Sequence, residues 1–204
     1  MREPVRIGVL ALQGDFAAHA RALGRLGVEA PEVRNPGDLA GLDGLVIPGG
    51  ESTTLLTLMG ETFPPVLRAF HEAGRPIYGT CAGLILLARE VVSPPQPSLG
   101  LIDVTVERNA YGRQRESFET EGEARFAGAP APLRMVFIRA PRIVRTGAGV
   151  TTLATHRAEP VLVQAGTVLA GTFHPELTDD LGVHRHFRDL CRAAASRLPQ
   201  PTLA

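Results

Sequence analysis

The sequence predicts an α/β fold: a doubly wound, mostly parallel sheet flanked by helices, with added antiparallel strands in the second half. Two observations predict it. Up to about residue 90, short apolar runs alternate with stretches that read as helices. Beyond that point, short β-like stretches follow one another with turn residues between them. The 204 residues suffice for one domain, which we expect to span residues 1–197 before a flexible tail at 198–204.

The first half supplies the parallel strands. Residues 5–12 form a continuous apolar run, the pattern of a strand buried on both faces. Asp15 is placed to cap a helix over 16–26, with Gly27 at its end. We expect further strands over 28–33, 44–47 and from Pro76 into Cys81, and helices over 54–59 (beginning near Ser52), 65–73 and from residue 84 onward.

The second half of the chain has a different pattern of predicted elements. Residues 93–98 are rich in proline and form a loop, and the last helix covers 184 to about 196. We expect mainly antiparallel strands over 102–106, 118–125, 135–138, 150–154, 160–164 and 168–173.

Composition excludes several classes of partner. Hydrophobic residues make up 44% of the chain, which is typical of a soluble globular protein. Acidic and basic residues balance at 21 each, so no charge surplus points to nucleic acid or to a membrane surface. No apolar run approaches a transmembrane span, and the first residues lack the apolar core of a signal peptide.

Cysteine and lysine usage narrow the chemistry further. The two cysteines, Cys81 and Cys191, are too few for a disulfide framework, and a reducing cytoplasm fits better. The chain has no lysine, because all 21 basic residues are arginine. It therefore cannot form a Schiff base through its own lysine and has no P-loop lysine.

The segment Gly79-Thr80-Cys81-Ala82-Gly83 is the most informative motif. An apolar run precedes it and an apolar stretch follows it, so it is predicted to be a sharp turn between a strand and a helix. On such a nucleophile elbow the side chain is exposed at the helix N-terminus, where the helix dipole favours a reactive thiolate. A buried apolar cysteine is the commoner role, but the flanking glycines favour a catalytic one.

His174-Pro175-Glu176 supplies candidate partners for Cys81. Proline favours an extended conformation at His174, and in an extended segment both side chains leave the same face. Glu176 would then bind one imidazole nitrogen while the other faces Cys81, which makes a hydrolytic triad. Taken alone the tripeptide would be a surface turn, but it follows a predicted strand that ends at the same edge of the sheet.

Several other groups have a functional and an ordinary interpretation. Gly49 and Gly50 lie where a strand ends, so their N–H groups, with that of Ala82, are candidates for an oxyanion hole; the ordinary interpretation is a turn with Ser52 as helix cap. Arg108 and Arg139 are candidates for holding a charged substrate, although isolated arginines are usually solvated. His184 and His186 resemble a metal pair, but no ligand cluster accompanies them, so we expect helix-surface histidines and no metal.

Together these motifs resemble the class I, or triad-type, glutamine amidotransferases. Within that superfamily the match is best to the glutaminase subunits of two-component pyridoxal 5'-phosphate synthases. The motifs follow the family's order and cover nearly the whole chain up to the last helix: GVLALQG (8–14), PGGESTT (48–54), GTCAG (79–83), RNAYGRQ (108–114) leading to SFE (117–119), FIRAP (137–141) and FHPELT (173–178). Tyr111 departs from the family, which more often has phenylalanine there.

The resemblance implies a flavodoxin-like fold and a mechanism. The Cys81 thiolate would attack the side-chain amide of L-glutamine, His174 would give a proton to departing ammonia, Glu176 would orient the imidazole, and water would hydrolyse the glutamyl thioester. Ammonia would pass to a separate (β/α)₈ synthase subunit, and the chain itself would need no cofactor. The residues implied in glutamine binding are Gly50, Glu51, Ser52, Arg108, Ile138 and Arg139.

Three other functions remain open at this stage. A glutaminase subunit of another synthase, such as imidazole glycerol phosphate synthase, would share the triad. A non-catalytic regulatory subunit could share the fold, and a cysteine peptidase could share the architecture. The intact triad argues against the regulatory subunit, and release of ammonia from glutamine would separate the others from a peptidase.

Overall fold

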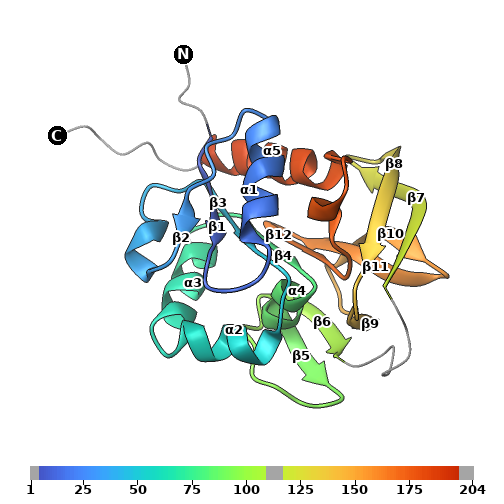
Figure 1. The fold of residues 1–204 in the computed structure, drawn as a ribbon, viewed down its shortest axis with the longest axis horizontal. Coiled ribbons are helices and arrows are strands. Elements are labelled where there is room, and N and C mark those ends of the chain that lie inside the picture. The colour runs from blue at the N-terminus through green and yellow to red at the C-terminus, as the bar shows by residue number, and fades with distance from the viewer. Residues whose placement is uncertain (1–4, 109–116, 198–204) are drawn as a thin grey trace.

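A nine-stranded sheet forms the centre of the molecule (Figure 1). The computed structural model describes residues 5–108 and 117–197. The first five strands of the sheet are mutually parallel and the remaining four are antiparallel. In spatial order the strands are β2 (Glu32–Val33), β1 (Ile7–Leu10), β3 (Gly44–Ile47), β4 (Ile77–Thr80), β12 (Val168–Gly171), β11 (Glu159–Ala165), β10 (Thr151–His156), β7 (Phe118–Phe126) and β8 (Ala129–Phe137).

Helices cover both faces of the parallel part. One face is covered by α1 (Phe16–Arg25) and α5 (Gly182–Ala195), which lie side by side in Figure 1. The other is covered by α2 (Ser52–Met59), α3 (Phe63–Glu72) and α4 (Ala82–Leu87). Two short 3-10 helices complete the connections, η1 (Pro36–Leu39) and η2 (Pro175–Leu177).

Alternation of side chains along the strands builds a core on each face. In β3, Leu45 and Ile47 join the core under α2, α3 and α4, whereas Val46 joins the core under α1 and α5. In β4, Ile77 joins the first of these cores and Tyr78 joins the second. All five side chains are fully buried, which is why these strands read as continuous apolar runs rather than as alternating ones.

A second sheet of three strands contains β5 (Ala88–Val92), β6 (Ile102–Glu107) and β9 (Arg142–Thr146). The sequence prediction found β6 but missed β5 and β9. Strand β5 begins directly where α4 ends, with no turn residue to mark the change.

The predicted fold class is confirmed, with differences in detail. The strand expected over 28–33 is reduced to Glu32–Val33, with one isolated bridge between Arg6 and Glu29. The expectation of mainly antiparallel strands fails at two places, because β12 pairs in parallel with β4 and β5 pairs in parallel with β6. The expected tail at 198–204 lies outside the described residues.

No helix within residues 5–108 and 117–197 is long and apolar enough to cross a membrane.

Candidate active site

Four loops meet at the carboxyl edge of the parallel strands. They follow β1, β3, β4 and β12, and they carry Gln13, Gly49 with Gly50, Cys81 and His174, respectively. A Cβ atom added to Gly49 would overlap the imidazole of His174 and would lie 3.3 Å from Cβ of Cys81. The three segments are therefore in direct contact at the edge where open α/β sheets hold their ligands.

Cys81 lies on the expected turn between β4 and α4, but it is buried rather than exposed as expected. It is the N-cap residue of α4 and has φ 49° and ψ −101°, a left-handed conformation that costs a non-glycine residue strain energy. Its N–H donates to the carbonyl of Gly171 at 2.8 Å, which ties the elbow to β12. The flanking Gly83 is packed so closely on β3 that an added Cβ would overlap the carbonyl oxygen of Ile47. The glycine is thus required by the packing of the elbow against the sheet.

His174 and Glu176 form the expected pair through a different backbone geometry. Nδ1 of His174 lies 2.7 Å from Oε1 of Glu176, and both residues are buried. The segment is not extended: Pro175–Leu177 is a 3-10 helix, and proline stands at its first position, where no N–H is needed. The backbone N–H of His174 donates to the carbonyl of Val136 in β8 at 2.8 Å, so the antiparallel part of the sheet also positions the imidazole.

The electrostatics of His174 favour its charged form. Burial alone would lower its pKa, but the hydrogen bonds and charges of Cys81 and Glu176 outweigh burial and raise the pKa to about 10. Burial likewise opposes the charge of Glu176, yet His19 and His174 hold the pKa of this carboxyl far below its usual range. The arrangement can therefore hold a thiolate beside an imidazolium, the charge state that a cysteine nucleophile and a proton donor need.

The Gly49–Gly50 loop is closely packed at the edge of the sheet. Gly50 has φ 149°, which L side chains rarely adopt, and an added Cβ would overlap the side chain of Gln13. The same Gln13 accepts a hydrogen bond from the N–H of Glu51 at 3.0 Å and so anchors the loop. Ala82 is the first residue of α4, where the amide has no carbonyl partner within the helix.

Glu51, not Ser52, caps α2. The Glu51 carboxylate accepts from the N–H groups of Thr53 and Thr54 at 3.0 and 2.6 Å. Burial opposes its charge, but these hydrogen bonds lower its pKa to about 2. The Ser52 hydroxyl instead donates to Oε1 of Gln96 at 2.9 Å. The proline-rich loop therefore closes over α2, a contact that sequence reasoning missed.

The remaining predicted binding residues lie around this loop or across the site from it. A guanidinium nitrogen of Arg108 donates to the Thr53 hydroxyl at 2.9 Å and lies 3.6 Å from the Glu51 carboxylate. Arg139 follows β8 with φ 44° and an exposed side chain, and Ile138 before it is half-buried. The rest of the motif that begins at Arg108, residues 109–114, lies outside the described residues.

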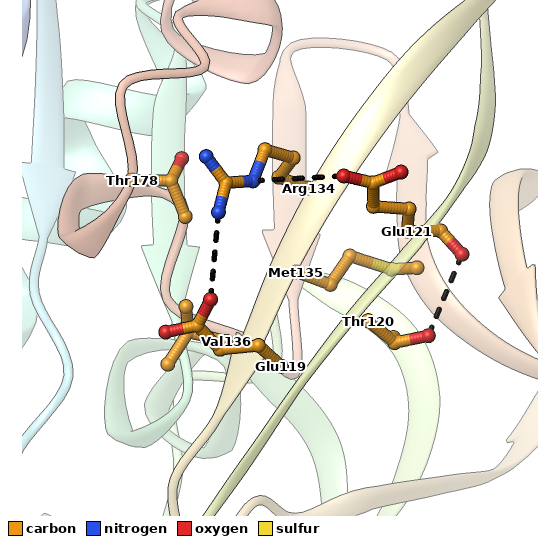
Figure 2. A pocket seen from close by; sticks show the side chains of 7 residues that line it. All are labelled: Glu119, Thr120, Glu121, Arg134, Met135, Val136 and Thr178. Atoms are coloured by element: carbon orange, nitrogen blue, oxygen red, sulfur yellow. Dashed lines mark hydrogen bonds and ion pairs between the residues drawn. The ribbon is translucent and has the colours of Figure 1, made fainter.

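The hollow shown in Figure 2 is separate from this site. It has a volume of about 200 Å³ and contains none of the residues expected to act on or bind glutamine. Arg134 lies in it between two exposed carboxylates, 3.5 Å from Glu119 and 4.0 Å from Glu121. Two carboxylates flank one guanidinium, so these exposed ion pairs leave a negative charge in the hollow, and each pair contributes little stability.

Two histidines expected on the surface of the last helix have different environments. His184 is fully buried against His19 and Tyr78, so the expectation of a surface histidine is wrong for His184. His186 is half-buried and stacks on Phe126. Among the residues of the two described ranges, no group of three or more side chains is arranged to hold a metal ion.

Known proteins are similar to this chain in sequence and in fold. The protein-family model described as the SNO glutamine amidotransferase family matches residues 9–192. The chain is 51% identical over 189 residues to "Pyridoxal 5'-phosphate synthase subunit PdxT" of Thermotoga neapolitana, with 92% of this chain and 100% of the relative covered. It is 53% identical over 191 residues to the protein of the same name from Deinococcus radiodurans, with 90% of this chain and 96% of the relative covered.

Solved structures agree with these relatives. A crystal structure of a glutamine amidotransferase is 50% identical, has a TM-score of 0.83, and is matched over 91% of this chain and 98% of its own. A putative GMP synthase component from Thermoplasma acidophilum shares the fold with a TM-score of 0.70 at 20% identity, over 96% of this chain and 98% of its own.

Proposed function

The chain belongs to the SNO glutamine amidotransferase family, and on that premise we propose that it is the glutaminase subunit of a pyridoxal 5'-phosphate synthase. The family match confirms the resemblance that the sequence motifs indicated. In this role the chain hydrolyses L-glutamine to L-glutamate and ammonia. The observation that carries the chemistry is the position of His174: Nδ1 lies 2.7 Å from Glu176, and a Cβ added to Gly49 would meet both the imidazole and Cβ of Cys81.

The first half-reaction uses the charged pair. The Cys81 thiolate attacks the side-chain carbonyl carbon of glutamine, and the carbon–nitrogen bond breaks as the His174 imidazolium gives its proton to the departing nitrogen. Ammonia leaves, and a glutamyl thioester and a neutral imidazole remain. Glu176 holds Nδ1 of His174, so the other ring nitrogen faces the reacting atoms.

The second half-reaction restores the enzyme. The neutral imidazole takes a proton from water, the resulting hydroxide adds to the thioester carbonyl, and the carbon–sulfur bond breaks. Glutamate is released with the thiolate and the imidazolium regenerated. In both halves the negative charge on the carbonyl oxygen would be stabilised by N–H groups of Gly49, Gly50 and Ala82, and one such donor contributes roughly 10²–10³ in rate.

Glutamine itself is bound by the groups around the Gly49–Gly50 loop. We assign Gly50, Glu51 and Ser52 from this loop and α2, Ile138 and Arg139 from the end of β8, and Arg108 from the end of β6. Arginine suits the substrate's α-carboxylate, because its planar fork binds two carboxylate oxygens. Glu51 keeps its negative charge at neutral pH and complements the α-ammonium group.

The ammonia is used by a second protein. We propose that this partner is a (β/α)₈ synthase subunit in a hetero-oligomer, because the chain contains no lysine for Schiff-base chemistry with sugar phosphates. We place the reaction in the cytoplasm, where reducing conditions keep Cys81 as a free thiol.

The test is ammonia production from glutamine by the chain alone and after co-purification with a pyridoxal 5'-phosphate synthase subunit. We expect the partner to raise the rate, since a glycine peptide such as Gly49–Gly50 can reorient at low steric cost when the partner docks. The Cys81→Ala chain in the same complex is the matched control and should release no ammonia. No ammonia from the wild-type complex would overturn the proposed function, and equal rates with and without the partner would remove the activation step alone.

A further inference from the structure

Two buried histidines lie behind the catalytic carboxylate. His19 of α1 and His184 of α5 are both fully buried, although they are 165 residues apart in the sequence. Nδ1 of His19 lies 3.0 Å from Nε2 of His184. On its other side, Nε2 of His19 lies 3.4 Å from Oε2 of Glu176 and 3.3 Å from the Thr80 hydroxyl. Imidazole, imidazole and carboxylate thus form a continuous row from α5 to the triad.

Glu176 needs a second partner because it is buried and charged. His174 occupies only Oε1, at 2.7 Å. Within the described residues, Oε2 has no hydrogen bond of good geometry, and the Nε2 atom of His19 is the group at ion-pair distance from it. A buried carboxylate oxygen without a donor is costly, and a donor that can approach it also fixes the direction in which the carboxylate faces.

The proton positions along the row follow from the surroundings of His184. Burial, with the neighbouring His19, lowers the pKa of His184 to about 3 despite the opposing charge of Glu176, so its ring is neutral at neutral pH. Nδ1 of His184 is buried without a partner among the described residues. The single proton is therefore best placed on Nε2, where it is donated to Nδ1 of His19. With Nδ1 of His19 as the acceptor, Nε2 is the nitrogen of His19 that can donate, and it faces Glu176 and Thr80.

The position of the rings is fixed by packing. Tyr78 of β4 meets both imidazoles edge-on, with ring centroids 6.2 Å from His19 and 6.3 Å from His184. Neither histidine reaches solvent, so neither can bind substrate directly. An effect on the reaction can pass through Glu176 or through Thr80, which precedes Cys81 and lies 3.3 Å from Nε2 of His19.

We propose that His19 is a positioning residue for the glutaminase reaction: its Nε2–H holds Oε2 of Glu176, so that Oε1 stays on His174, and His184 fixes the tautomer of His19. This inference rests on the proposed function. It extends the row of three catalytic residues by two buried imidazoles that touch neither glutamine nor ammonia.

A matched pair of substitutions tests it. The amide of His19→Gln reaches about as far as Nε2 and keeps a donor toward Glu176, whereas the amide of His19→Asn reaches only about as far as Nδ1. Both changes remove the imidazole and insert a neutral amide. In the assembled complex we expect His19→Asn to lower kcat for ammonia release by roughly 10- to 100-fold with little change in KM, and His19→Gln to recover most of that loss.

A second readout does not depend on glutamine. The pH dependence of Cys81 alkylation by iodoacetamide reports the Cys81–His174 pair directly, since Cys191 is fully buried. We expect the alkaline transition of this profile to move to lower pH in His19→Asn and to return toward wild type in His19→Gln. If folded His19→Asn and His19→Gln had equal kcat and equal alkylation profiles, the inference would be overturned. His19 would then have a structural role only.

The same contrast is available at position 184. His184→Leu removes the donor to Nδ1 of His19, whereas His184→Gln keeps a donor. If the position-19 variants do not fold, a comparison of these two position-184 variants tests the same row of side chains. Indistinguishable kcat in the two position-184 variants would then overturn the inference. A wild-type complex that released no ammonia would instead overturn the proposed function, and the alkylation profile would still test the row.

Discussion

The proposed catalytic half of the site and its proposed glutamine-binding half differ in how their polar groups are held. In the catalytic half, Cys81, His174 and Glu176 are all buried, and Nδ1 of His174 lies 2.7 Å from Glu176. In the binding half, the Glu51 side chain is 52% exposed and Arg139 is exposed as well. The first half is buried throughout, whereas the second is only partly buried: Ser52 is buried, but Glu51 and Arg139 are exposed.

The polar groups of the binding half also bond to one another. Glu51 caps its own helix, the Ser52 hydroxyl donates to Gln96, and Arg108 donates to Thr53. A substrate that uses these groups must replace the existing contacts, and the net gain of each exchange is small. Because the two halves differ in burial and in their existing hydrogen bonds, we expect substitutions in the catalytic half to change kcat and substitutions in the binding half to change KM.

The largest expected effect comes from Cys81→Ala, which removes the nucleophile. We expect glutamine hydrolysis in the complex to fall by several orders of magnitude, because no other thiol reaches the site. Alanine meets the same left-handed backbone as cysteine, so the melting temperature should change little. Cys191→Ala is the matched control: this thiol is buried between β3 and α5, and its loss should leave the rate near wild type. A folded Cys81→Ala chain with near-normal ammonia release would show that Cys81 is not the nucleophile.

The next effect concerns the proton on His174. Because its pKa is raised from 6.5 to about 10, the proton needed by departing ammonia is present up to that pH, and kcat/KM should fall as the pH rises through about 10. The stability gained from the same shift is fully present below pH 6.5 and is lost as the pH rises through about 10.

Glu176→Gln sharpens this prediction, since it replaces the carboxylate with a neutral amide. We expect the alkaline limb of the pH profile to move to lower pH and the rate to fall by roughly 10²–10⁴ at neutral pH. An unmoved limb would show that Glu176 does not stabilise the imidazolium.

Gly49→Ala tests the backbone that separates the two halves. The added methyl group would overlap the His174 imidazole, and a displacement of about 1 Å at a catalytic group costs about 10²-fold in rate. We expect kcat to fall by about that factor. Gly24→Ala in α1 is the control, because nothing lies within 4 Å of its added Cβ, and the change should stabilise the chain by roughly 0.5–1 kcal/mol. Equal rates for the two variants would mean that the Gly49 contact is not formed in the active enzyme.

Sequence reasoning predicted that the residues of the proposed catalytic half lie together because the signals are local. Gly79 and Gly83 around Cys81 mark a close approach of β4 and α4 that only glycine permits, and His174 and Glu176 are two residues apart. The backbone between this pair was predicted wrongly as extended, but a 3-10 turn that begins at proline brings the same two side chains together.

The missed features depend on packing between distant segments. Nothing next to His19 or His184 in the sequence shows that α1 and α5 lie on the same face, with His184 against His19 and His19 against Glu176. The contact of Gln96 with Ser52 likewise depends on how the 93–98 loop folds back over α2. The parallel pairing of β12 with β4 was also missed, because turn residues around a strand do not reveal its partner.

A smaller effect is expected from the arginines of the binding half. Arg108→Ala and Arg139→Ala should each raise KM for glutamine by about 10-fold while kcat changes less, since a charged hydrogen bond contributes about 1.5–3 kcal/mol. Arg134→Ala is the control, because that arginine forms only exposed ion pairs in the hollow of Figure 2. Steady-state kinetics of the complex give both constants. Unchanged kcat/KM in both variants would remove these residues from the binding half.

The smallest expected effect is at the contact between Ser52 and Gln96. The Ser52 hydroxyl is buried and already donates to Gln96 at 2.9 Å, so glutamine must displace that acceptor to use it. Ser52→Ala removes a neutral hydrogen bond with substrate and should raise KM by about 2- to 10-fold, whereas Gln96→Ala frees the hydroxyl and should leave KM equal or lower. The two substitutions remove opposite ends of one contact, so a purely structural contact would change KM in the same direction in both. Opposite directions, measured in the same complex, would show that the binding half exchanges its own hydrogen bonds for those of the substrate.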